Sequence, residues 1–186
     1  MKLIIGLGNY PLEYTNTRHN AGFMAIDSYC NTNRIVFDKD EFNGHFTIIN
    51  NSFIFAKPFT LMNLSGGFVK KMVDFYKINI DDILIICDDV HLNVGHLRVR
   101  KEGGAGGHNG LKDINLQLGT ENYKRLRIGV GPHLKTMDLA VFVLQKLNQA
   151  ELSITKALID DKVIKIINDF ISDVPFSSIM SKYNTK

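Results

Sequence analysis

A short stretch near the N-terminus gathers the residue types that ester hydrolysis needs. An apolar run over residues 3–7 ends at Gly8-Asn9, and His19 follows within the segment 17–22, Thr-Arg-His-Asn-Ala-Gly. The unperturbed pKa of histidine, about 6.5, suits proton exchange at neutral pH. The Asn9 amide offers two donors and one acceptor without charge, which suits it to polarise an ester carbonyl. We therefore interpret His19 as a general base for hydrolysis, against the alternative of an ordinary surface or core histidine.

A second apolar run, residues 83–87, ends at the carboxylate of Asp88. A carboxylate bonded to Nδ1 of a histidine fixes its tautomer and stabilises the imidazolium. Asp88 is thus the candidate orienter of His19, with a helix cap or a turn as the alternative. Asn63 and Asn109 have side chains that can polarise a carbonyl or hold a peptide backbone, although asparagine also forms turns and caps helices.

Several other chemistries lack their sequence patterns. The third glycine of a dinucleotide-binding loop would fall at position 11, which is Pro11. The chain contains no Walker phosphate-binding motif and no Gly-x-Ser-x-Gly elbow, and neither Cys30 nor Cys87 has a neighbouring base. Without Cys-x-x-Cys or Cys/His clusters, we expect no metal, cofactor or disulfide framework, and water is the expected nucleophile.

Strand and helix patterns alternate along the whole chain. This alternation predicts a single α/β domain over residues 1–186, with a mixed, mostly parallel β-sheet flanked by helices. No apolar run approaches the length of a membrane span, so the expected location is the cytoplasm. Residues 177–186 are polar and are expected to fray. The expected strands are 2–7, 45–50, 53–57, 83–87, 96–100 and 126–130, and the expected helices are 20–31, 65–76, 111–118, 137–146 and 149–171.

Basic residues are concentrated between positions 98 and 135. This segment carries eight lysines or arginines against three acidic residues, while the whole chain has a formal charge of only +3. Such a local excess can attract phosphates, or it can be a solvated face with no partner. Members of this group include Arg98, Arg100, Lys101, Arg125, Arg127 and Lys135.

Long motifs in register closely resemble the bacterial-type peptidyl-tRNA hydrolase family. The resemblance covers most of the chain and implies a monomeric fold around a twisted mixed sheet. The implied activity is cleavage of the ester between a peptide and tRNA, which recycles the tRNA in translation. The motifs are 6–9 with Tyr14 and 17–22, then 57–66, Asp88-Asp89, 97–100, 103–112 and 125–131.

The resemblance also implies roles for individual residues. His19 would be the base, Asp88 its orienter, and Asn9 a neighbour that polarises water or the carbonyl. The implied tRNA-binding residues are Arg98, Arg100, Lys101 and Arg127. The implied substrate-binding residues are Tyr14, Met62, Asn63, Gly106, His108 and Asn109, and activity should fall below about pH 6 as His19 becomes protonated.

Two positions depart from the family pattern. Tyr10-Pro11 follows Asn9 where the family has Pro-Gly, and His91 stands where the family has an acid. The main alternative function is a non-catalytic, RNA-binding member of the same fold that serves splicing. A nicotinamide oxidoreductase and an aminopeptidase-type metallohydrolase are further alternatives, disfavoured by Pro11 and by the lack of a compact ligand set.

Overall fold

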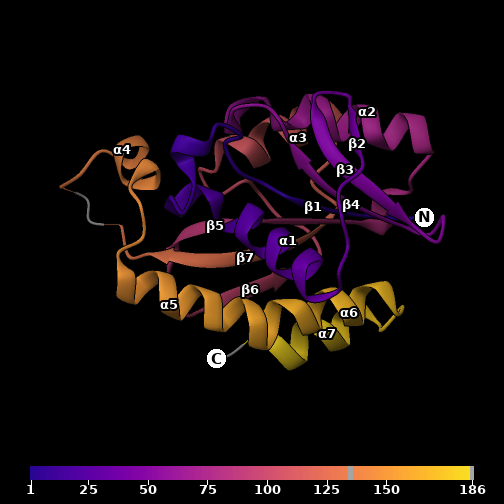
Figure 1. Cartoon of the computed structure of the whole chain (residues 1–186). Coiled ribbons are helices and arrows are strands. Elements are labelled where there is room, and N and C mark those ends of the chain that lie inside the picture. The colour runs from indigo at the N-terminus through magenta and orange to yellow at the C-terminus, as the bar shows by residue number, and fades with distance from the viewer. Residues whose placement is uncertain (134–135, 185–186) are drawn as a thin grey trace.

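The computed structural model describes residues 1–133 and 136–184, so Lys135 of the basic segment lies outside it (Figure 1). The strands are β1 (Lys2–Gly6), β2 (Lys39–Glu41), β3 (Gly44–Ile49), β4 (Phe53–Pro58), β5 (Ile83–Asn93), β6 (Leu97–Arg100) and β7 (Lys124–Gly131). The helices are α1 (Ala21–Thr32), α2 (Ser65–Tyr76), α3 (Asn109–Leu118), α4 (Leu139–Leu144), α5 (Gln149–Leu158), α6 (Ile164–Ile171) and α7 (Phe176–Tyr183).

All seven strands form one mixed sheet in the order β2-β3-β4-β1-β5-β7-β6. The four central strands, β4, β1, β5 and β7, are parallel to one another. Antiparallel strands form the two edges, β2 and β3 at one and β6 at the other. The expected fold class, an α/β domain with a mixed sheet that is parallel in its centre, is confirmed.

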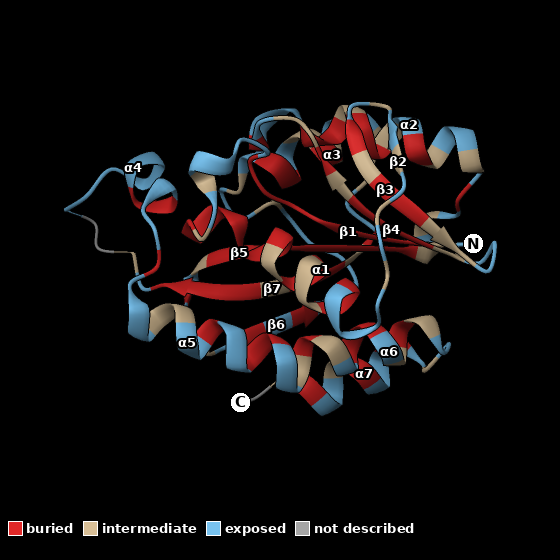
Figure 2. Cartoon of the chain, viewed as in Figure 1, coloured by how far each residue is buried: buried red, intermediate tan, exposed pale blue. Residues whose placement is uncertain are grey.

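Helices cover both faces of the sheet. Alternate residues of β1 point to opposite sides, so Ile4 joins the core beneath α1, α6 and α7, while Leu3 and Ile5 join the core beneath α2 and α3. Figure 2 shows the central strands buried and the outer helix faces exposed. Two covered faces explain why β1 and β5 begin as continuous apolar runs in the sequence.

Several elements differ from the sequence-based expectation, among them β2 and α7, which were not expected at all. Strand β5 extends to Asn93 rather than ending at Cys87, because its last residues still pair with β7, with Asn93 opposite Gly131. The helix expected over 137–146 is confined to α4, and the long helix expected over 149–171 contains a π-helical segment, Ile159–Val163, between α5 and α6.

The C-terminal segment is ordered through residue 184, so the expectation of a frayed end from 177 is wrong for these residues. Phe176, Ile179 and Tyr183 of α7 are buried against the sheet. The Asn184 side chain makes two hydrogen bonds to the backbone of Val99 in β6, at 2.7 and 2.9 Å. Across the described ranges, 1–133 and 136–184, no helix is long and apolar enough to cross a membrane.

Candidate active site

The candidate site lies where β1 and β5 approach the start of α1. His19 belongs to a short 3-10 turn, Arg18–Asn20, directly before α1. Gly22, in the first turn of α1, allows the helix to touch the strands: a Cβ there would lie 2.3 Å from the carbonyl oxygen of Ile86 and 2.5 Å from the backbone nitrogen of Leu7. The missing side chain therefore lets the helix bring His19 toward β5.

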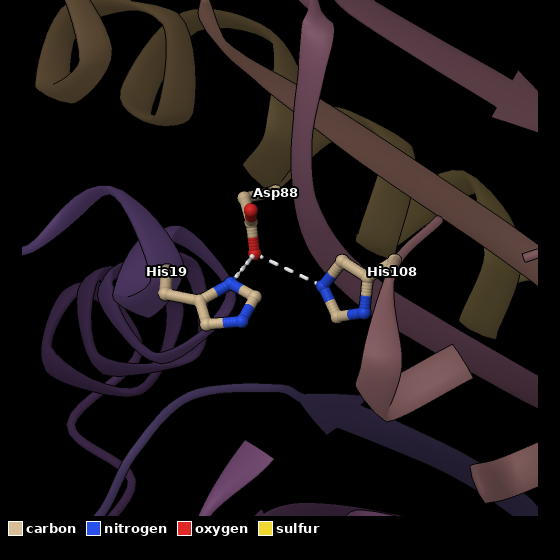
Figure 3. A group of neighbouring side chains, drawn as sticks. All are labelled: His19, Asp88 and His108. Atoms are coloured by element: carbon tan, nitrogen blue, oxygen red, sulfur yellow. Dashed lines mark hydrogen bonds and ion pairs between the residues drawn. The ribbon is translucent and has the colours of Figure 1, made fainter. Parts of the chain in front are cut away.

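Two histidines converge on one carboxylate oxygen. His19 Nδ1 lies 2.8 Å from Asp88 Oδ1, and His108 Nε2 lies 3.0 Å from the same oxygen (Figure 3). Asp88 is 2% exposed and His19 is 8% exposed. Because an ionised carboxylate only accepts hydrogen bonds, both ring nitrogens facing it carry protons. The Nε2 of neutral His19 is then an acceptor, and no hydrogen bond within the described part of the chain engages it.

The charges of this group are set by burial and by the short contacts. Burial alone would lower the pKa of His19, but the Asp88 carboxylate outweighs it and raises that pKa above its ordinary value of 6.5. Burial alone would raise the pKa of Asp88, but His19 and His108 hold it well below the usual range. These contacts favour the ionised form of Asp88.

The tautomer of His108 is fixed by the helix that it caps. Its Nδ1 accepts a hydrogen bond from the backbone N–H of Leu111, at 3.3 Å, in the first turn of α3. The proton of the neutral ring is thus on Nε2, which donates it to Asp88. The sequence-based interpretation left His108 as a loop or substrate-binding residue and contained no signal for its bond to Asp88, 20 residues away.

Asn9 is held in one orientation beside this group. Its backbone N–H donates to Asn20 Oδ1 at 2.8 Å, and its carbonyl accepts from Asn20 Nδ2 at 3.0 Å. Its side-chain Oδ1 accepts the backbone N–H of Met62 at 2.7 Å. Since Oδ1 is engaged, Nδ2 is the Asn9 group left to donate, and the described residues make no hydrogen bond to it.

A cavity of about 340 Å³ opens beside the two histidines. Arg127 and residues of α4 such as Leu139 and Val143 form other parts of its lining. Asn9, Tyr14, Met62 and Asn63 do not line it. Asn9 and Met62 are buried, Tyr14 is half-buried, and Asn63 is exposed. The sequence-predicted site residues in its wall are His19, Asp88, Gly106, His108, Asn109 and Arg127.

The basic residues separate into two groups. Arg98 and Arg100 are exposed on β6, where they alternate with buried Leu97 and Val99, and Lys101 is exposed directly after them. Arg127 faces inward, with its guanidinium 3.4 Å from Asp89 Oδ2 and donating to the carbonyl of Gly104 at 2.8 Å.

Arg125 contributes nothing to a basic surface, although the sequence analysis counted it among the basic residues between positions 98 and 135. It is 1% exposed, and its guanidinium donates to the carbonyls of Gly103, Gly104 and Glu121. These bonds hold the start of the glycine loop that carries His108.

Arg18, which the sequence analysis did not single out, connects the segment next to His19 to the C-terminal third of the chain. Its guanidinium donates to both Glu151 carboxylate oxygens at 2.8 and 2.9 Å and to the Val130 carbonyl at 2.8 Å. It also lies 4.5 Å from the centre of the Phe142 ring in α4. The backbone of the two segments is paired as well. The Arg18 N–H donates to the Gln145 carbonyl, and Thr17 forms a β-bridge with Lys146.

The donor set of the site suits hydrogen bonding better than metal binding. His19, Asp88 and His108 offer ligand atoms that lie within 4.8 Å of one another. The bond from Leu111 to His108 Nδ1, however, leaves a proton on Nε2, and a protonated nitrogen cannot ligate a metal. The cysteines do not offer a nucleophile, because burial raises the pKa of Cys30 and of Cys87 to about 12.

This chain is similar to known proteins in both sequence and fold. The family model described as peptidyl-tRNA hydrolase matches residues 3–186. A peptidyl-tRNA hydrolase of Mycoplasma mycoides is 46% identical, over 99% of this chain and 100% of its own length, and one of Mycoplasmoides gallisepticum is 45% identical over 99% and 100%. The crystal structure of peptidyl-tRNA hydrolase from Acinetobacter baumannii superposes with a TM-score of 0.89 at 34% identity, covering 100% of this chain and 95% of that one. Match over the whole length in both sequence and fold shows that this chain belongs to the peptidyl-tRNA hydrolase family.

Proposed function

We propose that this protein hydrolyses the ester between the peptide and the tRNA of peptidyl-tRNA, with His19 as general base. The observation that carries the proposal is the hydrogen bond between His19 Nδ1 and Asp88, at 2.8 Å. It leaves Nε2 without a hydrogen bond to any described residue, in a side chain that lines the cavity. A base needs this arrangement, with one nitrogen fixed by a carboxylate and the other available to a water molecule.

The reaction begins when His19 Nε2 takes a proton from water as the water oxygen attacks the ester carbonyl carbon. Asp88 remains ionised and stabilises the imidazolium that forms. The tetrahedral intermediate then collapses, the C–O bond to the ribose breaks, and the imidazolium returns its proton to the departing ribose oxygen. The products are a free peptide carboxyl group and a tRNA with its hydroxyl restored.

Negative charge on the carbonyl oxygen of the intermediate requires a donor in a fixed position. Nδ2 of Asn9 fits this role, because the bonds to Asn20 and Met62 fix the amide while leaving Nδ2 unpaired by described residues. Donors that are already oriented stabilise an oxyanion without reorganisation. Asn109, exposed at the first position of α3, is proposed to grip the substrate at the opposite wall.

The tRNA is proposed to approach along β6. Arg98, Arg100 and Lys101 project from this edge strand and can pair with phosphates, while Arg127 lies nearer the reacting ester. Tyr14, Met62 and Asn63 are proposed to support the peptide side of the site, Met62 through its backbone bond to Asn9. A cytoplasmic location, a monomeric state and independence of metals or cofactors complete the proposal.

The test is release of free tRNA from N-acetyl-aminoacyl-tRNA by the wild type and by His19→Ala. Loss of a positioned base costs about 10²- to 10⁴-fold in kcat, while binding of uncleaved tRNA should remain within about twofold of the wild type. His96→Ala removes an exposed histidine outside the site and serves as the matched control, with kcat expected to stay unchanged.

Turnover by His19→Ala at the wild-type rate would exclude His19 as the base. If the wild type bound tRNA but released none from the ester, the alternative of a non-catalytic RNA-binding protein would be supported instead.

A further inference from the structure

Arg18 is a buried cation that no step of the proposed hydrolysis uses. It directly precedes His19 in the 3-10 turn Arg18–Asn20, and it is 8% exposed. Burial of a charged group costs free energy unless the group is paired and hydrogen-bonded. Arg18 does not line the cavity that His19 lines. Any part that it plays in the reaction must therefore act through its neighbour, so its partners show what its burial achieves.

The guanidinium of Arg18 contacts three elements of the chain at once. Its Nη2 donates to both carboxylate oxygens of Glu151 in α5, at 2.8 and 2.9 Å, and its Nη1 donates to the Val130 carbonyl in β7, at 2.8 Å. The centre of the Phe142 ring in α4 lies 4.5 Å from its central carbon, Cζ. One side chain thus joins the turn that carries His19 to a strand and two helices.

Glu151 is itself held in place at the start of α5. Its Oε2 accepts the backbone N–H of Asn148 at 2.9 Å, and its own N–H donates to Asn148 Oδ1 at 2.9 Å, which together form a capping box. The carboxylate therefore cannot follow Arg18 if the turn shifts. It is a fixed anchor for the guanidinium.

Consecutive residues of the turn are fastened to neighbouring strands. Arg18 binds Val130 of β7, whereas His19 binds Asp88 of β5, and these two strands are adjacent in the sheet (Figure 3 shows the contact of His19 with Asp88). A turn that is fastened at one residue can pivot about it, while two fastenings fix its rotation as well. Rotation matters for a base, because a misplacement of about 1 Å can cost as much as 100-fold in rate.

We propose that Arg18 is a positioning residue: through its pair with Glu151, it holds the turn so that His19 meets Asp88 with Nε2 directed at the reacting ester. This inference rests on the proposed hydrolase function, because it concerns the orientation of the base. The alternative is that the pair only stabilises the fold, as any buried ion pair of this kind could do.

Lys2 provides a matched comparison at the start of β1. Its ammonium lies 2.5 Å from Asp173 Oδ1, donates to the Phe170 carbonyl at 2.5 Å and lies 5.0 Å from the centre of the Phe170 ring. The Lys2 side chain is 11% exposed and that of Arg18 is 10% exposed. Both cations thus combine a carboxylate, a carbonyl and an aromatic ring, but Lys2 lines neither the cavity of His19 nor the larger cavity beside α1.

The test removes each pair without leaving a lone charge, in Arg18→Met/Glu151→Gln and in the control Lys2→Met/Asp173→Asn. Glutamine at position 151 can still cap α5. For the first variant we expect kcat to fall about tenfold, because the base is misplaced. Its KM should stay within about twofold of the wild type, because the proposed phosphate contacts on β6 are unchanged. The control should keep the wild-type kcat, even where its melting temperature falls as far.

A second readout needs no substrate, namely the pKa of the His19 ring followed by NMR. Asp88 raises this pKa against the effect of burial. A loosened contact should therefore lower the pKa in Arg18→Met/Glu151→Gln, while the control should keep the wild-type value. His108, whose ring centre lies 5.0 Å from that of His19, is unchanged in both variants. Arg18→Lys keeps the charge but not the planar fork, so its kcat should recover to about threefold below the wild type.

The outcomes separate this role from simple stabilisation. Equal kcat and equal His19 pKa in the two double variants would overturn the proposal, and so would a raised KM with unchanged kcat, since Arg18 would then act in binding. If Arg18→Met/Glu151→Gln does not fold, Arg18→Lys decides: a lowered kcat with a lowered His19 pKa would support the proposal, and wild-type values would overturn it. A wild type that cleaves no peptidyl-tRNA would reject the hydrolase function, while the His19 pKa would still show whether Arg18 holds the ring.

Discussion

At the scale of single residues, one oxygen of Asp88 accepts hydrogen bonds from two histidines, and the two rings differ in what their second nitrogen contacts. His19 is turned so that its second nitrogen is free, whereas the second nitrogen of His108 is occupied by the backbone of α3. His108 therefore anchors the carboxylate to a helix, and the carboxylate in turn fixes the base. This arrangement assigns His108 a positioning role, which its place in the sequence-predicted substrate site did not describe.

The pH dependence of the reaction follows from the same contacts. If His19 is the base as proposed, its neutral form is the active one. Its raised pKa then means that kcat/KM should fall as the pH drops through a value above 6.5, earlier than the fall below about pH 6 expected from the sequence. Asp88→Asn removes the cause of the increase, so burial should then move the inflection below 6.5. Initial rates between about pH 5 and 9 measure both profiles. A wild-type profile that is flat across this range would point to another base.

At the scale of elements, close contact between α1 and the sheet brings His19 to Asp88. Gly22 is the residue that permits this contact, since Ile86 and Leu7 occupy the space of a side chain. Gly67 provides a contrast in the third position of α2, because a Cβ there would meet nothing within 4 Å. The same substitution at these two glycines should therefore have opposite effects.

We expect Gly22→Ala to destabilise the protein by about 2–3 kcal/mol, because the added methyl group forces α1 away from backbone atoms that cannot give way. Its kcat should fall as well, since His19 moves with the helix. Gly67→Ala should stabilise by about 0.5–1 kcal/mol, because alanine is the better helix former. Urea unfolding followed by circular dichroism measures both changes, and equal stability of the two variants would refute the packing argument.

The sequence predicted the elements that have a regular apolar pattern. It failed where the residue types do not indicate the helix or strand that the residues form. Helix α2 spans the predicted residues 65–76, because its apolar face is periodic. The end of β5 was missed because His91 and Asn93 give no strand signal, although Asn93 still pairs with Gly131 of the neighbouring β7. Helix α7 was missed because its serines hide the spacing of Phe176, Ile179 and Tyr183, whose burial depends on a sheet surface formed much earlier in the chain.

Some contacts of the candidate site were likewise predicted from the sequence, and others were not. The expected partnership of His19 and Asp88 is seen as a 2.8 Å contact, while the roles of these residues stay proposals. The ion pair of Arg18 with Glu151 could not be predicted, because it joins residues separated by 133 positions through a fold-dependent contact. Tyr10 and Pro11, where the sequence departs from the family pattern, line a second cavity of about 550 Å³.

At the scale of the whole molecule, the RNA part of the substrate is proposed to meet the exposed arginines of β6. Binding of phosphates by these arginines releases counterions, so the salt dependence of binding should report on β6.

Arg98→Ala and Arg100→Ala should each weaken binding of tRNA and reduce the slope of log affinity against log salt concentration by about 1. Arg34→Ala, which removes an exposed arginine after α1, is the matched control and should leave the slope unchanged. Binding titrations at several salt concentrations give these slopes. Identical slopes for all three variants and the wild type would remove β6 from the RNA surface.

The pairing of residues 16–18 with 145–147 has a consequence for the order in which the enzyme is completed. All seven strands precede residue 132, so a growing chain holds the whole sheet before it contains Gln145, Lys146 and Glu151. Domains begin to fold as synthesis proceeds from the N-terminus. The segment next to His19 therefore gains its ion pair with Glu151 and its backbone pairs with Gln145 and Lys146 only after the strands of its scaffold have been synthesised.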